Sequence, residues 1–413
     1  MKKNKQKVVV AGGGFAGVKT ALSLAGNNDI SVTLISDSDD FSYYPSLYHT
    51  ATGGSSGVSS FPLAELFDAG RVEIIKAKVT GLDRALKHVK TSDGEEIDYD
   101  YLVLALGAVT NFFGIPGLQE RAYGIKSLQD AEELKRHLHQ QIIDERKPDT
   151  NYVVVGGGPS GIELAGALGD YMRQIYKKHG VGRRSVHVDL VEAAPRLVPR
   201  MPPSVSKQLA RQLRKKGVRL YLKAAVQGET AGELIVNGKP IRSHTVIWTA
   251  GMANNSFFRE QGFQLTKAGK VRVDHYLQAE PGIFVIGDNA DTPYSGMAQT
   301  AIHDGAYIAR SLIDMISDKK APMPYRAKKP IYVMPAGSHW ASVVWGPLKL
   351  HGRLGWVLRR AADFMGYKDY EPFFKASRRW LTEYERSDLC TVCQPADSGD
   401  KFDSLAAQPS KPH

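Results

Sequence analysis

Short apolar runs that end at glycines and lead into helical patterns recur along the chain. Val8–Val10 is such a run, and apolar residues at helical spacing begin after its glycines at Phe15 and continue to Leu24. Ile30–Ile35 is a second apolar run. A strand, a glycine turn, a helix and a second strand form a βαβ unit, so we predict a parallel sheet at the start of the chain.

The same order of patterns returns near the middle of the chain. Val153–Val155 leads into glycines, a helical pattern covers Ile162–Tyr176, and Val186–Val191 reads as the next strand. A repeat on the scale of a whole domain indicates duplicated domains rather than a solenoid. The fold class predicted is therefore α/β, with two Rossmann-type domains.

Between and after these units the pattern predicts further elements. We expect a loop at 41–60, a crossing into another domain at 111–117 and a helix at 130–144. The remaining predicted strands are 72–75, 87–91, 101–106, 246–251 and 282–287.

These elements divide the chain into four parts. We assign residues 1–112 and 270–320 to one dinucleotide domain and 113–269 to a second. Residues 321–386 form a C-terminal segment that begins with a proline-containing linker and is aromatic and basic from residue 331 on. The polar tail 387–413 is expected to be disordered.

Composition narrows the class of protein. The chain has 413 residues, 42% of them hydrophobic, and a formal net charge of +11. This is a globular composition, and the length suits two or three domains. The basic excess fits an anionic membrane surface, an acidic substrate or a solvated surface. Nucleic acid is disfavoured because the sequence holds no recognisable nucleic-acid-binding motif.

The cysteine count excludes several chemistries. The two cysteines, Cys390 and Cys393, both lie in the polar tail. No disulfide framework is expected, nor a redox cysteine pair beside a cofactor in the body of the chain. Cys390-x-x-Cys393 supplies only half of a zinc site, so no metal is predicted, although a redox pair in the tail stays open. We expect no signal peptide, and no apolar run is long enough to span a membrane.

Both glycine loops have the spacing of dinucleotide cradles. Gly12-x-Gly14-x-x-Gly17 and Gly156-x-Gly158-x-x-Gly161 each follow a strand and open a helix. The first glycine allows a tight turn, the second a close approach to pyrophosphate, and the third close helix packing. We predict FAD in the first domain and a nicotinamide nucleotide in the second.

An acid at the end of the second strand of each unit would hold the ribose. Asp37 is the candidate in the first domain, although Ser36 can occupy the position. Glu192 is the candidate in the second, which favours NADH because a carboxylate repels a 2′-phosphate. Arg196 lies close enough in sequence to pair with such a phosphate, so NADPH stays open.

Several motifs carry a family resemblance. AGGGFAG at 11–17, GGGPSGIELAGAL at 156–168, VEAAPRLVP at 191–199 and WTAGM at 248–252 resemble the pyridine nucleotide–flavin oxidoreductases. YYPSLYHTATGG at 43–54, GDNA at 287–290 and SGMAQTAIHDG at 295–305 resemble the type II NADH dehydrogenases, which are peripheral NADH:quinone oxidoreductases. The resemblance covers roughly residues 7–315.

The resemblance implies roles for matching residues. Asp288 would bind the ribityl chain, and Ala298 and Gln299 would line the flavin on the quinone side. Glu163 would lie at the junction of flavin and nicotinamide, unless it only complements the helix dipole. His303 and Asp304 replace the Gln or Glu of many relatives; His303 either supplies a proton to the quinone or is an ordinary satisfied histidine.

The predicted sites follow from motifs and resemblance together. The catalytic candidates are Glu163, Gln299 and His303. The FAD-binding candidates are Gly12, Gly14, Phe15, Ala16, Gly17, Ser36, Asp37, Val79, Ala105, Gly107, Gly287, Asp288, Ala298 and Gln299. The NADH-binding candidates are Gly156, Gly158, Pro159, Ser160, Gly161, Glu163, Glu192, Ala250 and Gly251.

The C-terminal segment mixes tryptophans and other apolar residues with Lys and Arg between 340 and 381. That mixture is typical of a helix at an anionic membrane interface, although a docking helix or a homodimer interface would also fit. We therefore expect a non-proton-pumping NADH:quinone oxidoreductase, peripheral to the cytoplasmic face of the cell membrane. A soluble reductase of an electron-transfer protein and an NADH-sensing flavoprotein are the alternatives.

Overall fold

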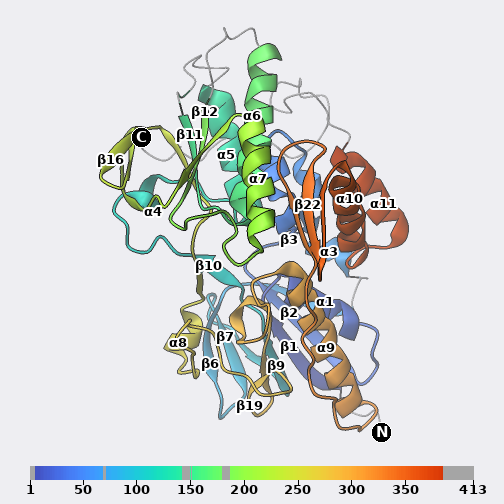
Figure 1. Ribbon diagram of the computed structural model, residues 1–413. Helices are drawn as coiled ribbons and strands as arrows, with labels where there is room; N and C mark the ends of the chain where they lie inside the picture. Colours follow the sequence, from blue (N-terminus) through green and yellow to red (C-terminus); the bar gives the residue numbers. More distant parts are fainter. Residues whose placement is uncertain (1–4, 68–70, 142–148, 150, 179–186, 385–413) are drawn as a thin grey trace.

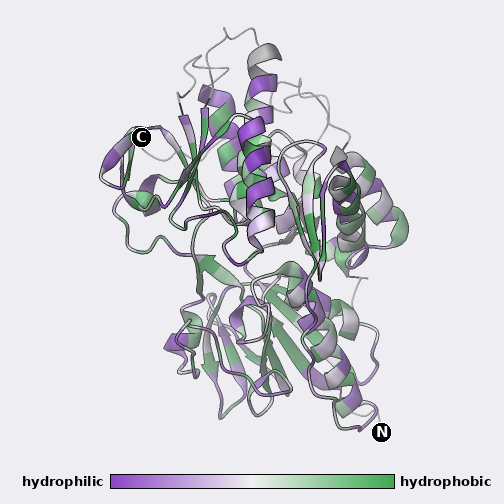
Figure 2. Cartoon of the chain, in the orientation of Figure 1, coloured by the Kyte–Doolittle hydropathy of each residue, from purple (hydrophilic) through white to green (hydrophobic). Residues whose placement is uncertain are grey.

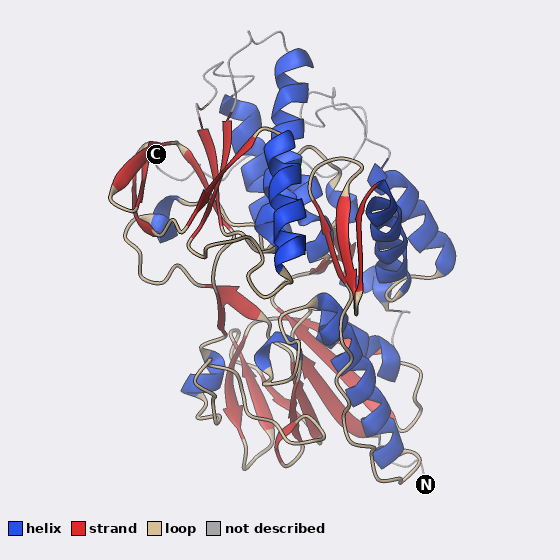
Figure 3. Cartoon of the chain, in the orientation of Figure 1, coloured by secondary structure: helices blue, strands red, loops and turns tan. Residues whose placement is uncertain are grey.

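The computed structural model describes residues 5–67, 71–141, 149, 151–178 and 187–384. The predicted domain repeat appears as two lobes joined by crossing strands, with a C-terminal unit against them (Figure 1). Sheets form the centre of each lobe, and helices cover them (Figure 3). Cys390 and Cys393 lie outside the described residues, as does the end of the predicted helix 130–144.

The first lobe is built on a six-stranded sheet of order β19-β20-β9-β1-β2-β5. Its strands are β19 (Gln278–Glu280), β20 (Ile283–Val285), β9 (Tyr101–Leu104), β1 (Gln6–Ala11), β2 (Ile30–Ser36) and β5 (Val72–Lys76). β1 pairs in parallel with both β2 and β9, as the βαβ pattern predicted. Helices α1 (Phe15–Leu24) and α9 (Ala298–Ile316) pack against each other beside this sheet (Figure 1).

Two smaller parts complete the first lobe. One is an antiparallel sheet of β6 (Val79–Asp83), β7 (His88–Thr91) and β8 (Glu96–Asp98). The other replaces the loop expected at 41–60 with short elements, because Phe41 and Phe61 are fully buried and hold β3 and β4 together. These elements are β3 (Asp40–Ser42), α2 (Leu47–Ala51), β4 (Ser60–Pro62) and α3 (Leu63–Leu66), with 3₁₀ turns η1 (Tyr44–Ser46) and η2 (Ser56–Val58).

The second lobe repeats the plan with a parallel sheet of order β13-β12-β11-β17. Its strands are β13 (Val218–Leu222), β12 (His187–Glu192), β11 (Asn151–Val155) and β17 (Thr245–Trp248). The helices are α4 (Leu118–Arg121), α5 (Leu128–His139), α6 (Pro159–Lys178) and α7 (Pro203–Lys215). An antiparallel sheet of β14 (Val226–Thr230), β15 (Glu233–Val236) and β16 (Lys239–Arg242) lies at its edge. In Figure 2 the central strands are hydrophobic and α7 is largely hydrophilic on the side in view.

The lobes are joined at paired strands β10 (Ala108–Thr110) and β18 (Met252–Asn254), which run antiparallel. Phe258, in α8 (Phe257–Glu260), and Phe263 pack in the core of the first lobe beside Val9 and Leu102. The chain therefore returns to the first lobe near β18, earlier than the boundary at residue 270 that the sequence indicated.

The C-terminal unit begins with a sheet rather than a helix. β21 (Tyr332–Pro335), β22 (Ala341–Trp345) and β23 (Leu348–Gly352) form an antiparallel meander, followed by α10 (Arg353–Lys368) and α11 (Phe373–Tyr384). The helix predicted for this segment is therefore wrong before residue 353, since residues 341–344 are consecutive buried positions of a strand. The 3₁₀ turn η4 (Gly287–Asn289) follows β20 in the first lobe.

Candidate functional site

The first glycine loop has the geometry of a phosphate cradle. A Cβ on Gly12, whose φ is +117°, would lie 2.1 Å from the Ala105 carbonyl oxygen, and one on Gly17 would lie 1.9 Å from the Gly12 oxygen. A Cβ on Gly14 would meet nothing within 4 Å. Two glycines are therefore required by packing, and the middle one faces open space at the start of α1, where backbone N–H groups favour an anion.

The second loop repeats this geometry. A Cβ on Gly161 would lie 1.9 Å from the Gly156 oxygen, and Gly158 again has nothing within 4 Å. Pro159 and Ser160 are exposed in the first turn of α6. The two open cradles in one chain are what two dinucleotides need.

Glu192 is held firmly at the end of β12. Its two carboxylate oxygens each accept a backbone N–H at 2.6 Å, one from Gly157 and one from Ala194. The side chain of Arg196 is turned away to neighbouring groups, donating to Met201 O at 2.7 Å and Ser206 Oγ at 2.9 Å. The fixed carboxylate and the engaged guanidinium both favour a free ribose 2′-hydroxyl over a 2′-phosphate.

In the first lobe Ser36, not Asp37, stands where Glu192 stands in the second. A Cβ on Gly13 would lie 2.3 Å from Ser36 Oγ, just as one on Gly157 would lie 2.8 Å from Glu192 Oε2. Ser36 is buried and donates to Ser38 O at 2.7 Å, while Asp37 is exposed beside it.

The turn that contains Asp288, η4, lies against the first turn of α1, since a Cβ on Gly287 would lie 3.3 Å from the Cβ of Ala16. Burial raises the pKa of Asp288, and its carboxylate accepts the Gly296 N–H while the charges of Lys270 and Lys126 oppose the rise. Asn289 is fully buried and exchanges two hydrogen bonds with Gly107, at 2.7 and 2.9 Å. The turn is therefore fixed to the end of β9.

Lys126 was missed by the sequence analysis. Its Nζ is buried and has no hydrogen-bond partner among the described residues, and burial lowers its pKa. A buried ammonium that interacts with Asp288 fits an anionic or carbonyl-bearing cofactor such as FAD. The sequence feature that could have located Lys126 is the capping box of Ser127 and Asp130, because it places Lys126 immediately before α5.

The side chains of two catalytic candidates bind the linker that follows α9. Gln299 donates to Ile331 O at 2.9 Å and accepts from Ile331 N at 3.0 Å. His303 Nε2 lies 2.9 Å from the Arg326 carbonyl oxygen. Ala298 begins α9, where free N–H groups face outward from the helix.

The other binding candidates lie around the two cradles. Val79 and Ala105 are buried, and Phe15 and Ala16 form the buried first turn of α1. Gly251, beside Ala250, has a φ of +76°, and a Cβ there would lie 2.4 Å from the Asn111 oxygen. The strand-to-glycine ending at 246–251 is thus confirmed as a tight turn between lobes.

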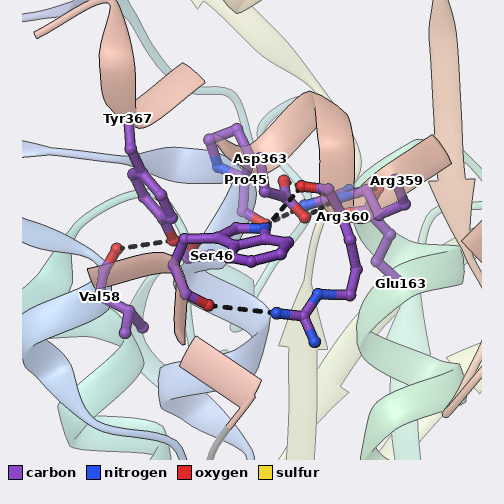
Figure 4. Close-up of polar contacts among 9 residues, drawn as sticks. Pro45, Ser46, Val58, Glu163, Arg359, Arg360, Asp363 and Tyr367 are labelled. Carbon is purple, nitrogen blue, oxygen red and sulfur yellow. Dashed lines mark hydrogen bonds and ion pairs between the residues drawn. The ribbon is translucent and has the colours of Figure 1, made fainter. Parts of the chain in front are cut away.

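Glu163 joins a buried charge cluster with the C-terminal unit (Figure 4). Arg359 of α10 lies 3.4 Å from Glu163 Oε1, donates through Nε to both oxygens of Asp363 at 2.8 Å, and donates to Pro45 O at 2.8 Å. Burial raises the pKa of Glu163 to about 7, with the nearby Asp363 acting in the same direction and Arg359 opposing it. A carboxyl with this pKa can give or take a proton near neutral pH.

Comparison with known proteins agrees with this geometry. The family model described as pyridine nucleotide-disulphide oxidoreductase matches residues 6–305. The type II NADH:quinone oxidoreductase of Staphylococcus haemolyticus is 28% identical over 78% of this chain and 85% of its own. The enzyme of the same name from Staphylococcus aureus is 28% identical over 76% and 83%.

Solved structures share the fold. An NDH2 from Plasmodium falciparum, solved in complex with NADH, superposes with a TM-score of 0.84 at 16% identity, covering 94% of this chain and all of that one. A sulfide:quinone oxidoreductase from Aquifex aeolicus superposes with a TM-score of 0.74 at 22% identity, covering 91% and 92%. The family match spans well over half of the sequence, and both cradles lie within it. The chain belongs to the pyridine nucleotide-disulphide oxidoreductase family.

Proposed function

We propose that the chain is a non-proton-pumping NADH:quinone oxidoreductase, with FAD in the first lobe and NADH in the second. The observation that carries the proposal is the pair of glycine loops whose middle glycines, Gly14 and Gly158, are both open. The matched Staphylococcus proteins are named for this activity, and each match covers most of both chains. FAD, when bound, accepts a hydride from NADH and passes two electrons to a quinone.

The residues of the first lobe fit FAD. The Gly12–Gly17 loop would hold the pyrophosphate, Asp288 the ribityl hydroxyls, and the buried ammonium of Lys126 would balance negative charge near Asp288. In the second lobe Glu192 would accept hydrogen bonds from the NADH ribose hydroxyls. NADPH would place its 2′-phosphate against a carboxylate, while the guanidinium of Arg196 is already bonded to Met201 O and Ser206 Oγ.

Glu163 is our candidate for handling protons. Its pKa of about 7 allows both states at neutral pH, and it lies on the helix that opens at the nucleotide cradle. Gln299 and His303 would contribute differently, since their side chains hold the backbone of residues 326 and 331. We assign them to shaping the flavin side of α9 rather than to proton transfer.

A dithiol mechanism does not fit this family member. The sequence has no cysteine before Cys390. Reduction of a disulfide or oxidation of sulfide through an enzyme thiolate has no residue to carry it in the two lobes. Electron transfer directly from flavin to quinone needs no such residue.

The C-terminal helices offer a surface for an anionic membrane. In α10, Leu354, Val357 and Met365 are exposed at helical spacing, and in α11 Phe374 is 85% exposed. Exposed basic residues accompany them: Lys349, Arg353, Lys368, Lys375 and Arg378. An exposed apolar stripe with cations is suited to the headgroup boundary, where a quinone would also be reached. Among the described residues no helix is long and apolar enough to cross a bilayer.

Anaerobic spectroscopy tests the reaction. Full-length protein loaded with FAD is mixed with NADH or NADPH, then with a soluble short-chain quinone, and flavin and nucleotide absorbance are followed. Bleaching by NADH and recovery with quinone over many turnovers supports the proposal. Bleaching without recovery refutes the assignment of a quinone as electron acceptor and favours a protein acceptor. A reduced flavin that persists with every acceptor tried favours an NADH-sensing flavoprotein.

Vesicle binding tests the membrane surface. The wild type should co-sediment with vesicles whose fraction of anionic lipid matches that of the cytoplasmic leaflet of a cell membrane. A variant with both Leu354→Glu and Val357→Glu should not co-sediment. If the variant still binds vesicles but becomes monomeric, the exposed stripe is a homodimer interface and the membrane assignment is wrong.

A further inference from the structure

Asp304 is a buried carboxylate that the proposed reaction does not use. It is fully buried in the second turn of α9. Its Oδ2 accepts the N–H of Gly287 at 3.1 Å, and its Oδ1 accepts the hydroxyl of Tyr325 at 2.6 Å. Tyr325 belongs to the linker that leads from α9 to the C-terminal unit. The carboxylate thus bridges the turn that presents Asp288 and the segment that leads to the helices α10 and α11.

The packing around Asp304 requires close contact with the phosphate-binding helix. A Cβ on the adjacent Gly305 would lie 2.5 Å from the carbonyl oxygen of Ala16, in the first turn of α1. A Cβ on Gly287 would lie 3.3 Å from the Cβ of Ala16. The start of α1, the second turn of α9 and η4 therefore meet at one point, and Asp304 supplies a hydrogen bond across it.

The other two residues of the turn are fixed as well, Asp288 through its carbonyl oxygen and Asn289 through its side chain. Lys270 donates from Nζ to the carbonyl oxygen of Asp288 at 2.9 Å. Asn289 bonds to Gly107 and donates to Asn254 Oδ1 at 2.6 Å. Each residue of the turn is therefore held by at least one hydrogen bond, and Asp304 holds the first of them, Gly287.

Both hydrogen bonds of Asp304 are charge-assisted in its ionised state. Burial raises its pKa to about 6, while Tyr325, Gly287 and His303 oppose the rise and Asp288 adds to it. Loss of one donor to a buried carboxylate leaves it undersolvated, which is costly. Tyr325 therefore does more than pack against Tyr307, whose ring centroid lies 5.1 Å away.

We propose that Asp304 is a positioning residue for the flavin-binding turn, and that Tyr325 acts through it, so that the linker to the C-terminal unit sets how the first lobe holds its cofactor. This inference rests on the proposed FAD site. Asp304 contacts the turn and not the cofactor, so it is not a catalytic residue.

FAD binding to the full-length chain tests the inference. Cofactor is stripped, FAD is titrated back, and the dissociation constant is read from flavin fluorescence together with the visible circular dichroism of the bound flavin. Tyr325→Phe should weaken FAD binding about tenfold, because a hydrogen bond to a charged acceptor is lost. The matched control is Tyr307→Phe. The hydroxyl of Tyr307 donates to Met323 O in the same linker and makes no hydrogen bond to Asp304.

A double variant separates positioning from general packing. Asp304→Asn can still accept from Gly287, so it should fold, and adding Tyr325→Phe to it should weaken binding by clearly less than tenfold if Tyr325 acts through Asp304. Equal FAD affinity in Tyr325→Phe and Tyr307→Phe, or strictly additive effects in the double variant, would overturn the inference. If the wild type takes up no FAD, both the proposed function and this inference are wrong. If all variants bind FAD as tightly as the wild type, only this inference is wrong.

Discussion

Replacing Arg359 with methionine removes the arginine that pairs with both Glu163 and Asp363 (Figure 4). The side chain of Arg359 is 5% exposed, and those of Asp363 and Glu163 are 3% and 12% exposed. Methionine fills a similar length but leaves both carboxylates and the Pro45 carbonyl without this donor. We expect Arg359→Met to lower the stability of the protein by roughly 3–5 kcal/mol, the usual cost of breaking a buried ion pair from one side.

The loss should depend on pH in a definite direction. Glu163 has a pKa of about 7 in the fold, above its ordinary value of 4.5, so the folded state binds the proton more tightly than the unfolded chain. Such a group costs stability as the pH rises through that range, and Arg359 limits the cost. Without Arg359, protonation of Glu163 relieves the buried charge readily at pH 6, whereas at pH 8 the same protonation costs more free energy. The destabilisation should therefore be larger at pH 8 than at pH 6.

Thermal unfolding of the two proteins at both pH values checks this. Arg353→Met is the matched control, because Arg353 is exposed at the start of the same helix. It should change stability by no more than about 0.5 kcal/mol. A loss in Arg359→Met that is the same at pH 6 and pH 8, or as small as that of the control, would show that the cluster is not held by the arginine.

Three further outcomes follow from the site. Gly12→Ala should lower the melting temperature sharply, whereas Gly14→Ala should fold normally and lose FAD, as measured by flavin content, because only the second Cβ enters open space. Glu192→Gln should raise the KM for NADH about tenfold or more and narrow the preference for NADH over NADPH in steady-state kinetics, because a neutral amide replaces the carboxylate that Gly157 N–H holds at 2.6 Å and that we propose accepts the ribose hydroxyls. Glu163→Gln should remove the limb of the quinone-reduction pH profile near 7, where its pKa lies; a retained limb would assign the proton to another group.

The repeated cradles were readable from the sequence because they depend on local rules. A glycine whose Cβ would overlap a carbonyl oxygen cannot be replaced without moving the backbone, so the pattern Gly12, Gly14, Gly17 directly reports a tight strand-to-helix turn. Parallel pairing of β1 with β2 then follows from the βαβ unit. The family match over residues 6–305 confirms the family resemblance that these motifs carried.

Long-range partners were not readable in this way. Arg359 reaches Glu163 across nearly two hundred residues, and nothing near either residue specifies the other. The strands at 341–352 were mistaken for helix because short apolar runs with aromatic residues fit both periods until their cross-strand partners are known. The orphan Nζ of Lys126 is likewise defined only by the fold that buries it.

The two loops also show what the glycine pattern leaves open. Both place a strand-end side chain against the second residue of the loop, Glu192 near Gly157 and Ser36 near Gly13. Glu192 uses both oxygens to accept loop N–H groups, whereas Ser36 donates to Ser38 O and so turns back on its own segment. The two loops thus share their backbone geometry but differ in the side chain that packs against it. Asp37 is exposed beside Ser36, so under the proposed function the carboxylate nearest the first loop would approach a ribose from outside that loop, whereas Glu192 is part of the second loop's own hydrogen bonding.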